Sequence, residues 1–409
     1  MQTDHPPTDL EAIENALANL RISSTSKPTQ AVALLAEASK QSIPTRQQLA
    51  DPSILRTLIE IIETSINDSL ESVDVALRCI GNACIDNSAA REAVTNIGFS
   101  WASLSLRAGS STDFATRTLT AKVLYNICSD CEPAQQQCYR DMLHQELIDL
   151  CARGAWQRPP GIELLLELLF WICSQKDQVV AQDSSTTTHN KSLPDGTLEK
   201  LISLPHDYHS GLEPEDFALL LETCLIFFRD PSIQRDISAH NHLPSVWRIL
   251  QENESKISDL SKDAEEDRKL LVPLSVSLTW CLSDIAASPG IPADTFADMH
   301  IKDVVVEAIK TRDSDWGNER LAIAGCQVLG NLLWSGKSVA SYVLEDVALQ
   351  HAVLEILNTS QDVELLHSTA GLLVQLCRPS VEIRENIVNN EQAQTALGPR
   401  WYQAAEGTG

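Results

Sequence analysis

Polar residues recur in this chain at nearly constant spacing, each inside a run that is otherwise apolar. Asn82 lies in the segment ALRCIGNACIDN, Asn126 in TAKVLYNICSD and Asn331 in AGCQVLGNLLWSG, and the first two asparagines are 44 residues apart. Steps of 44 to 47 residues from these asparagines lead to further residues in similar runs. We call all of them the frame positions, and the others are Glu37, Trp171, Asp284 and Gln375. One structural unit of about 45 residues is therefore used repeatedly.

A helical repeat of about 40 to 47 residues is typical of armadillo and HEAT solenoids. The chain is 43% hydrophobic with only 5% aromatic residues, which favours close packing of helices over sheets. We expect an all-α fold, a right-handed solenoid superhelix of about eight repeats, forming one domain over residues 10–400. Residues 1–9 and 401–409 are expected to be disordered. Such a solenoid usually offers a surface for partners rather than an active site.

The spacing is broken between Trp171 and Asp284, which are 113 residues apart. One repeat lies between them in the segment EPEDFALLLETCLIFFRDPSIQRDI. Its frame position is either Ile226 or Phe227, and the sequence does not decide between them.

The excess length falls in two segments. Residues 176–198 are rich in Ser and Thr with little apolar content, which predicts a flexible loop. Residues 252–269, ENESKISDLSKDAEEDRK, predict an acidic insertion or a solvated extension of a helix. Neither segment ends the domain, because the frame resumes after each.

The chain is strongly acidic, with a net charge of −25 from 31 basic and 56 acidic residues. Residues 201–300 alone hold 17 acidic and 7 basic side chains. Such a field repels nucleic acid and anionic membranes and attracts basic proteins or basic tails. The N-terminal segment lacks the features of a signal peptide, and no apolar run approaches the roughly 20 residues of a membrane span. We expect a cytoplasmic monomer without integral membrane contact, with a nuclear location left open.

The cysteines follow the frame. Cys128 and Cys131 form a C-x-x-C motif, which alone is a weak metal or redox signal. Thiols at one repeated position of a packed helix are small core residues, so we predict no metal site and no cofactor. Cys84, Cys128, Cys173 and Cys377 follow a frame position by two residues, and Cys79 and Cys281 precede one by three.

The histidines that lie close together are His206 with His209 and His240 with His242. No cysteine or acidic cluster beside them in the sequence completes a metal site. The sequence also lacks a phosphate-binding glycine loop, a nucleophile elbow and an HExxH motif. We therefore predict a binding protein with no catalytic residue.

The helix that carries the frame position lines the concave side of a three-helix repeat. An asparagine there can bind an extended partner backbone through both a donor and an acceptor. It can equally bind its own solenoid and hold adjacent helices together. The sequence leaves both roles open for Asn82, Asn126 and Asn331.

Residues four positions before a frame residue share its helical face. Trp280 with Asp284 makes a W-x-x-x-D pair that resembles the W-x-x-x-N of importin-α. These positions predict a groove that is basic near its start and acidic and aromatic from the middle onward, suited to a basic segment. The residues at these positions are Arg78, Lys122, Glu167, Trp280, Gln327 and Gly371.

Glu163, Glu167 and Trp171 form a stripe on one helical face, although Trp171 can alternatively fill a gap in the core. The candidate partner-binding residues are Asn82, Asn126, Glu163, Glu167, Trp171, Trp280, Asp284 and Asn331.

The repeats resemble those of armadillo proteins and, within that group, those of the SmgGDS family, which are atypical exchange factors and chaperones of small GTPases. The similarity covers most of residues 10–395. Trp171, Asp284 and Gln375 depart from the asparagine expected at a frame position. The segments that carry the resemblance are ENALANLRIS, VALRCIGNACIDNSAAREAVTNIG and LAIAGCQVLGNLLWSGKSVASYVLEDVALQHAVLEIL.

Similarity to the SmgGDS family implies binding of Rho- or Ras-family GTPases, contact with their polybasic and prenylated C-termini, and guanine-nucleotide exchange by promotion of GDP release. Such exchange needs no catalytic side chain, because tighter binding of the nucleotide-free GTPase drives release. The segment LRCIGNACID is also similar to ataxin-10-like proteins. The alternative is therefore an armadillo scaffold or adaptor without exchange activity. A transport adaptor is a third interpretation, disfavoured by the single W-x-x-x-[ND] pair.

Overall fold

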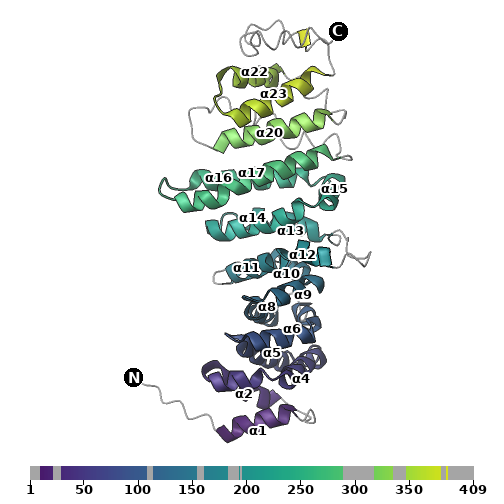
Figure 1. The fold of residues 1–409 in the computed structure, drawn as a ribbon, viewed down its shortest axis with the longest axis vertical. Helices are drawn as coiled ribbons and strands as arrows, with labels where there is room; N and C mark the ends of the chain where they lie inside the picture. The colour runs from purple at the N-terminus through teal and green to yellow at the C-terminus, as the bar shows by residue number, and fades with distance from the viewer. Residues whose placement is uncertain are drawn as a thin grey trace. The chain divides into compact units, whose positions relative to one another are not determined.

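The computed structural model describes residues 10–21, 29–107, 114–153, 161–182, 193, 196–288, 317–334, 347–378 and 384–385. Every regular element within these residues is an α-helix (Figure 1). The all-α prediction is therefore confirmed for this part of the chain. The ends expected to be disordered, residues 1–9 and 401–409, lie outside it.

The chain divides into two compact units, Met1–Lys191 and Ser192–Gly409, which are described in turn. The helices of the first unit are α1 (Leu10–Arg21), α2 (Thr29–Gln41), α3 (Ile43–Leu49), α4 (Pro52–Ser65), α5 (Leu70–Cys84), α6 (Ser88–Ile97), α7 (Ser100–Arg107), α8 (Ala115–Cys128), α9 (Glu132–Arg140), α10 (Leu143–Ala152), α11 (Ile162–Cys173) and α12 (Lys176–Gln182).

The helices of the second unit are α13 (Thr197–Tyr208), α14 (Pro214–Phe228), α15 (Pro231–Ala239), α16 (Leu243–Asp259), α17 (Glu265–Ala287), α20 (Gly317–Trp334), α22 (Val347–Thr359) and α23 (Val363–Cys377).

Packing in the first unit repeats one plan. The frame positions lie on α2, α5, α8 and α11, and each of these helices packs on the next. The intervening helices α4, α7 and α10 pack on α5, α8 and α11 in the same order. Leu77, Ile80 and Leu124 are fully buried at these contacts, and burial of each such side chain contributes about 1.5–3 kcal/mol.

Local signals explain where the helices stop and restart. Asp86 and Asp130, each four residues after a frame asparagine, both have a φ of 51°, in the left-handed region. Asp tolerates this conformation better than most residues, so the chain turns sharply at both places. Asn87 then caps α6, because its side-chain oxygen accepts the Ala90 N–H at 3.2 Å. The segment DNSAAREAV therefore marks the end of α5 and the start of α6.

Gly81 allows α5 and α8 to approach closely. A Cβ atom at this position would lie 3.0 Å from Cγ2 of Val123 on α8, closer than ordinary packing permits. Gly81 directly precedes the frame residue Asn82, so the closest approach of the two helices occurs at the frame position.

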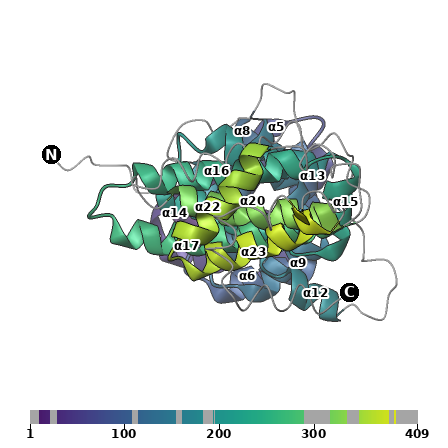
Figure 2. The ribbon, with the colours of Figure 1, turned by 90° about the horizontal axis from the view of Figure 1, so that it is seen from above.

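The frame positions of the second unit lie on α14, α17, α20 and α23, which also pack in order. Figure 1 shows α17, α20 and α23 as successive layers, and these helices overlap when seen from above in Figure 2. Phe227 is 2% exposed, whereas Ile226 is half-buried, as are Asn82, Asn126 and Asn331. Ile226 is therefore the frame residue of α14, which the sequence alone could not decide.

One helix is an exception to the prediction that no segment resembles a membrane span. By length and composition α17, with 23 residues, is apolar enough to cross a bilayer, but half of its most apolar window is buried inside the protein. It packs against α14, α16 and α20 in the second unit. We interpret α17 as a core helix of this unit.

The two segments of excess length need correction. Residues 176–182 of the predicted loop form α12, because Val179 is buried and the helix packs on α9; residues 183–192 and 194–195 lie outside the described part. Residues 252–269 comprise the end of α16, a turn and the start of α17. The helix extension is partly buried rather than solvated: Asn253 donates to the Leu271 carbonyl at 3.1 Å and to Ser275 Oγ at 2.7 Å.

The cysteines occupy the core positions expected of them. Cys79, Cys84, Cys128, Cys173 and Cys281 are buried free thiols, and Cys377 is half-buried. Burial raises the pKa of Cys79 and of Cys84 to about 12, so both thiols stay protonated near neutral pH. The predicted packing role of these residues is confirmed.

Replacement of Gly81 by alanine tests the close approach of α5 and α8. The added methyl group contacts Val123, so we expect Gly81→Ala to lower the free energy of unfolding by about 1–2 kcal/mol despite the better helix propensity of alanine. Gly371→Ala is the matched control, because nothing lies within 4 Å of a Cβ there. It should be neutral or stabilising in calorimetry. Equal shifts for both variants would contradict the account.

His144 predicts acid sensitivity of the first unit. Its side chain is 3% exposed and stacks on Tyr139, and burial lowers its pKa to about 4 from the usual 6.5. Between pH 6.5 and pH 4 the unfolded chain therefore binds more protons than the folded chain. The free energy of unfolding falls by up to about 3 kcal/mol as the pH decreases through this window. Thermal melts across the window should show a shallower pH dependence for His144→Phe than for His240→Gln, an exposed control. Parallel profiles would refute this assignment.

Candidate functional site

Asn82 on α5 binds the preceding frame helix, α2. Its Nδ2 donates to the carbonyl oxygen of Ala36 at 3.2 Å and to Oγ of Ser39 at 2.9 Å. The buried Ser39 hydroxyl also donates to the Ala36 carbonyl, at 3.0 Å. The Ala36 carbonyl oxygen therefore accepts from a side chain of its own helix and from one of the next frame helix.

Asn126 and Asn331 repeat this interaction in the same register. Asn126 Nδ2 donates to the Gly81 carbonyl at 3.3 Å, and Asn331 Nδ2 donates to the Ser283 carbonyl at 2.9 Å and to its hydroxyl at 2.8 Å. Ala36, Gly81 and Ser283 each directly precede a frame residue. Of the two roles that the sequence left open, the structure shows these amide nitrogens holding adjacent helices together.

Trp171 and Glu167 on α11 connect to α8 through a tyrosine that sequence reasoning did not select. The Tyr125 ring stacks on Trp171 with centroids 4.8 Å apart, and its hydroxyl donates to Glu167 Oε2 at 2.7 Å. Burial first, and then Glu167, raise the pKa of Tyr125 to about 12. Trp171 is half-buried, so it packs between helices while one part of its surface still reaches solvent.

The remaining predicted residues of the first unit lie on the same face with less packing. Arg78 on α5 and Lys122 on α8 are exposed, and Glu163 on α11 is half-buried one turn before Glu167. The frame helices of this unit therefore present basic side chains on α5 and α8 and acidic side chains on α11, in the order that the sequence predicted.

Trp280 and Asp284 are the most accessible of the predicted residues. Trp280 is 61% exposed, and Asp284 is exposed one turn later on α17. Ser283 and Ala287 share this helical face at spacings of three and four residues. An indole held in solvent is unusual for a side chain of that size, so this face is a candidate contact surface.

A pocket of about 450 Å³, with both polar and apolar side chains in its lining, opens on the same face between α17, α20 and α23. Asn331 and Gln327 line it from α20, and the Gln327 amide donates to Ser368 Oγ at 3.1 Å. Trp334 also lines the pocket and is 62% exposed, with the Arg378 guanidinium 4.1 Å from its ring centroid. The pocket offers amides, hydroxyls and an aromatic edge. Its further lining residues are Ser283, Ala287, Cys326, Gly330, His367, Gly371, Leu372 and Gln375.

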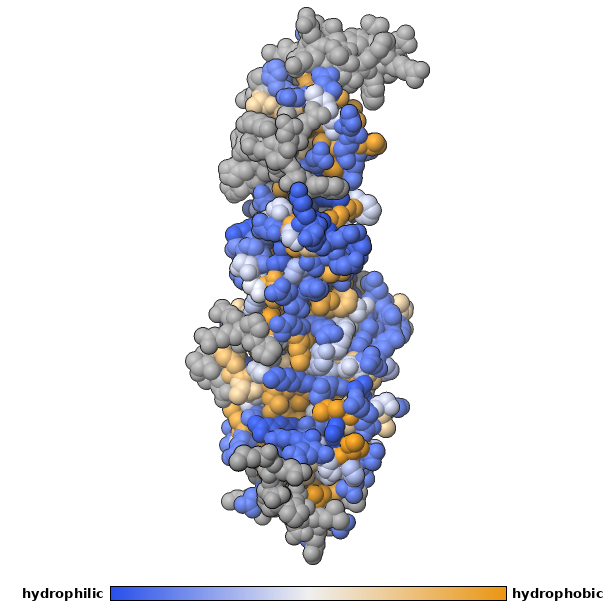
Figure 3. All heavy atoms as spheres, turned by 90° about the vertical axis from the view of Figure 1, so that its left-hand side faces the viewer, coloured by the Kyte–Doolittle hydropathy of each residue, from blue (hydrophilic) through white to orange (hydrophobic). Residues whose placement is uncertain are grey.

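We call the α17, α20 and α23 surface that carries Trp280, Asp284, Asn331, Trp334 and Gln375 the frame face of the second unit. At the level of α16 and α17, the side drawn in Figure 3 is almost uniformly hydrophilic. Glu265 and Glu266, at the start of α17, are exposed acidic side chains. Negative charge therefore lies on the helix that also presents the exposed tryptophan.

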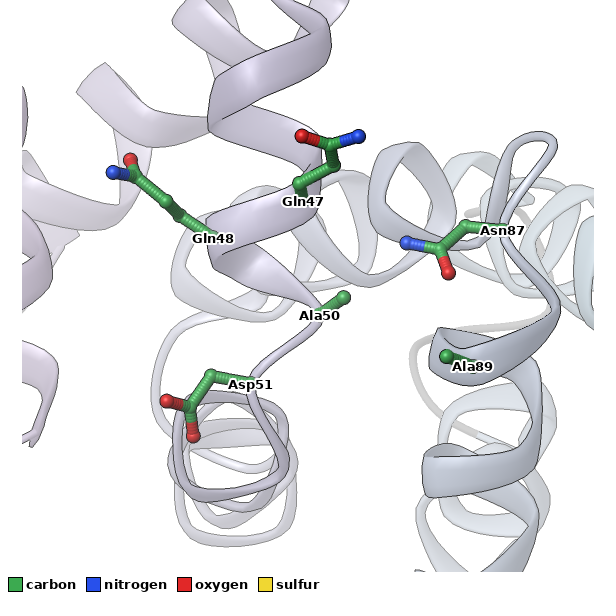
Figure 4. A pocket seen from close by; sticks show the side chains of 6 residues that line it. All are labelled: Gln47, Gln48, Ala50, Asp51, Asn87 and Ala89. Carbon is green, nitrogen blue, oxygen red and sulfur yellow. The ribbon is translucent and has the colours of Figure 1, made fainter.

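A second hollow, in the first unit, is less suited to a ligand. It lies between the end of α3 and the turn from α5 to α6, and Figure 4 shows Asn87 directed toward it while Gln48 points away. Asp51 and Asn87 already use their side-chain oxygens to cap α4 and α6. We interpret this hollow as a space between capped helix ends.

Sequence reasoning missed Tyr125, Trp334 and Arg378. Trp334 and Arg378 each lie three residues after a frame position, and Tyr125 lies one before. The frame could have found the Trp334–Arg378 pair, because equal offsets on adjacent frame helices bring side chains together.

No protein-family model matches this chain, and no curated protein matches it.

The asparagine bonds predict a stability cost on replacement. Asn82→Asp keeps the shape but cannot donate to Ala36 or Ser39, and it places a negative charge against a carbonyl. We expect a loss of about 1–3 kcal/mol in the free energy of unfolding. Trp280→Ala, at an exposed position, should change it by less than about 0.5 kcal/mol. Chemical denaturation of both variants measures the free energy of unfolding. An unchanged value for Asn82→Asp would contradict a stabilising role of the Asn82 bonds between α2 and α5.

Proposed function

We propose that the chain is a right-handed armadillo-type solenoid of about eight repeats that binds a protein partner through its frame helices. Two features support repeats of this kind. The frame asparagines donate to equivalent carbonyls, and Asp86 and Asp130 turn the chain in the same way four residues later. The asparagines are engaged inside the scaffold, so specificity for a partner falls to the positions that depart from asparagine.

The observation that carries the proposal is the exposed Trp280–Asp284 pair beside the pocket of the frame face. A tryptophan face and a carboxylate one helical turn apart can stack on and pair with one basic side chain of an extended segment. The amide of Gln375, a frame position that departs from asparagine and lines the pocket, suits the backbone or polar groups of that segment. The net charge of −25 would speed encounter with a basic partner at low salt.

In this proposal the basic segment is the polybasic C-terminal tail of a Rho- or Ras-family GTPase. Resemblance to the SmgGDS family suggests this partner, and the acidic balance of the chain agrees with it. Guanine-nucleotide exchange would follow if the protein binds the nucleotide-free GTPase more tightly than its GDP form. In this proposal the chaperone role covers the polybasic and prenylated C-terminus of such a GTPase.

The alternative is an armadillo scaffold or adaptor that uses the same surface for another basic partner without changing nucleotide release. Neither function requires a catalytic side chain or a cofactor. A nucleotide-release assay with prenylated and unprenylated Rho-type GTPases separates them. Accelerated GDP release supports the exchange factor, binding without acceleration supports the scaffold, and no binding to any of them at low salt overturns the GTPase proposal.

Reversal of one charge tests whether the frame face is the binding surface. Asp284→Lys should weaken the binding of a polybasic tail peptide about 10-fold or more at low salt and reduce the salt dependence of its dissociation constant. Glu60→Lys is the matched control, because Glu60 is exposed on α4, which carries no frame position, and the net charge changes equally. Isothermal titration at two salt concentrations measures both. Equal losses in the two variants would show that only the total charge matters.

A further inference from the structure

Two histidines and a glutamate converge in the second unit. His206 lies in the last turn of α13, His209 follows directly after this helix, and Glu252 lies on α16, which packs on α13. One ligand atom from each of the three side chains lies within 4.8 Å of the other two. Glu252 is 46 residues beyond His206, which is why the sequence offered no acidic partner for this histidine pair.

The hydrogen bonds around His209 prepare it to bind a metal ion. Its Nδ1 lies 3.0 Å from the carbonyl oxygen of His206, which can only accept, so Nδ1 carries the proton. In neutral His209 the lone pair is therefore on Nε2. A backbone carbonyl that receives the other ring N–H is the usual arrangement behind a metal-binding histidine, because it fixes the tautomer and the ring orientation.

Glu252 supplies a buried carboxylate with unused capacity. Its residue is 8% exposed, and its Oε2 is buried without a hydrogen-bond partner. Its Oε1 lies 2.6 Å from His206 Nδ1 and accepts from Arg248 Nε at 3.1 Å. A buried carboxylate oxygen without a partner is costly, so a cation at this point would relieve an unfavourable feature of the fold.

We propose that His206, His209 and Glu252 form a Zn²⁺ site that joins α13 to α16. Two imidazoles and one carboxylate are a ligand set that zinc takes in proteins, with water in the fourth position. Zinc bonds of about 2 Å place neighbouring ligand atoms about 3.3 Å apart, so the most widely separated of these atoms must close by at most about 1.5 Å. His206 and His209 are half-buried at a helix end, where rotation of the side chains can supply this movement.

Two cationic side chains near the proposed site, Arg248 and Lys256, have different roles. Arg248 is 56% exposed and can keep its bond to Oε1 while Oε2 binds the metal, so solvent screens its charge. Lys256 donates to the carbonyls of His209 and Leu212 at 3.0 and 2.8 Å. It therefore holds the end of α13 against α16 whether or not zinc is bound, and the ligands stay close to one another.

The test uses the full chain, stripped of metal by a chelator and titrated with ZnCl₂ in competition with a chromogenic chelator. We expect one tight site per chain and an affinity at least about 10-fold lower in His209→Gln, which keeps the fold because His209 is half-buried and outside α13. His240→Gln is the matched control, because His240 and His242 also stack, at 6.2 Å, and no carboxylate group completes their pair in the described residues. It should bind zinc like the native chain.

Two further readouts keep the assignment sharp. Co²⁺ substitution should give a visible d–d band without a thiolate-to-cobalt charge-transfer band. Zinc at 100 times the native Kd should shift the folding equilibrium by about 100-fold in the native chain and by at most about 10-fold in His209→Gln. A thiolate band would place the metal on cysteines and overturn the proposal. Equal zinc affinity in native protein and His209→Gln, or no binding by the native chain, would also overturn it and leave His206 and Glu252 as a hydrogen-bonded pair.

Discussion

The bond from a frame asparagine to a carbonyl of the preceding frame helix is the interaction on which the rest of the structure depends. It joins α5 to α2 and α8 to α5 in the first unit, and α20 to α17 in the second. Each bond ends on the residue just before a frame position, so it fixes the register of two helices as well as their contact. Where Gly81 occupies that place, the absence of a Cβ lets the helices approach to the distance that the bond requires.

This arrangement separates scaffold positions from positions left for a partner. The side-chain amide nitrogens of Asn82, Asn126 and Asn331 donate hydrogen bonds to neighbouring helices, and Trp171 packs against Tyr125. Trp280 and Asp284, by contrast, are exposed to solvent on α17 beside the pocket of the frame face. In the second unit, the frame positions that are not asparagine are therefore the ones whose side chains remain accessible to a partner. A binding function needs this division, because a residue that holds the scaffold cannot also be optimised for a ligand.

The sequence predicted the helical class, the core cysteines and the helix restart at Asn87, because these depend on local pattern and on the repeated spacing. It could not choose between Ile226 and Phe227, since both are apolar and the choice depends on which side of α14 faces α17. The burial of Asn253 and the meeting of Glu252 with His206 were also beyond it. Asn253 is buried by contacts of α16 with α17, and Glu252 meets His206 where α16 packs on α13, and neither contact follows from a local sequence pattern.

The central claim is that a basic partner binds the exposed frame face of the second unit and not the frame asparagines. Site-specific crosslinking can test it. A photoactivatable phenylalanine analogue would replace Trp280 in one protein and Glu60 in another, and each would be irradiated with a polybasic GTPase tail peptide. The account predicts a crosslinked product from position 280 that disappears at high salt, with none from position 60. Equal crosslinking from both positions, or a product from position 60 alone, would contradict it.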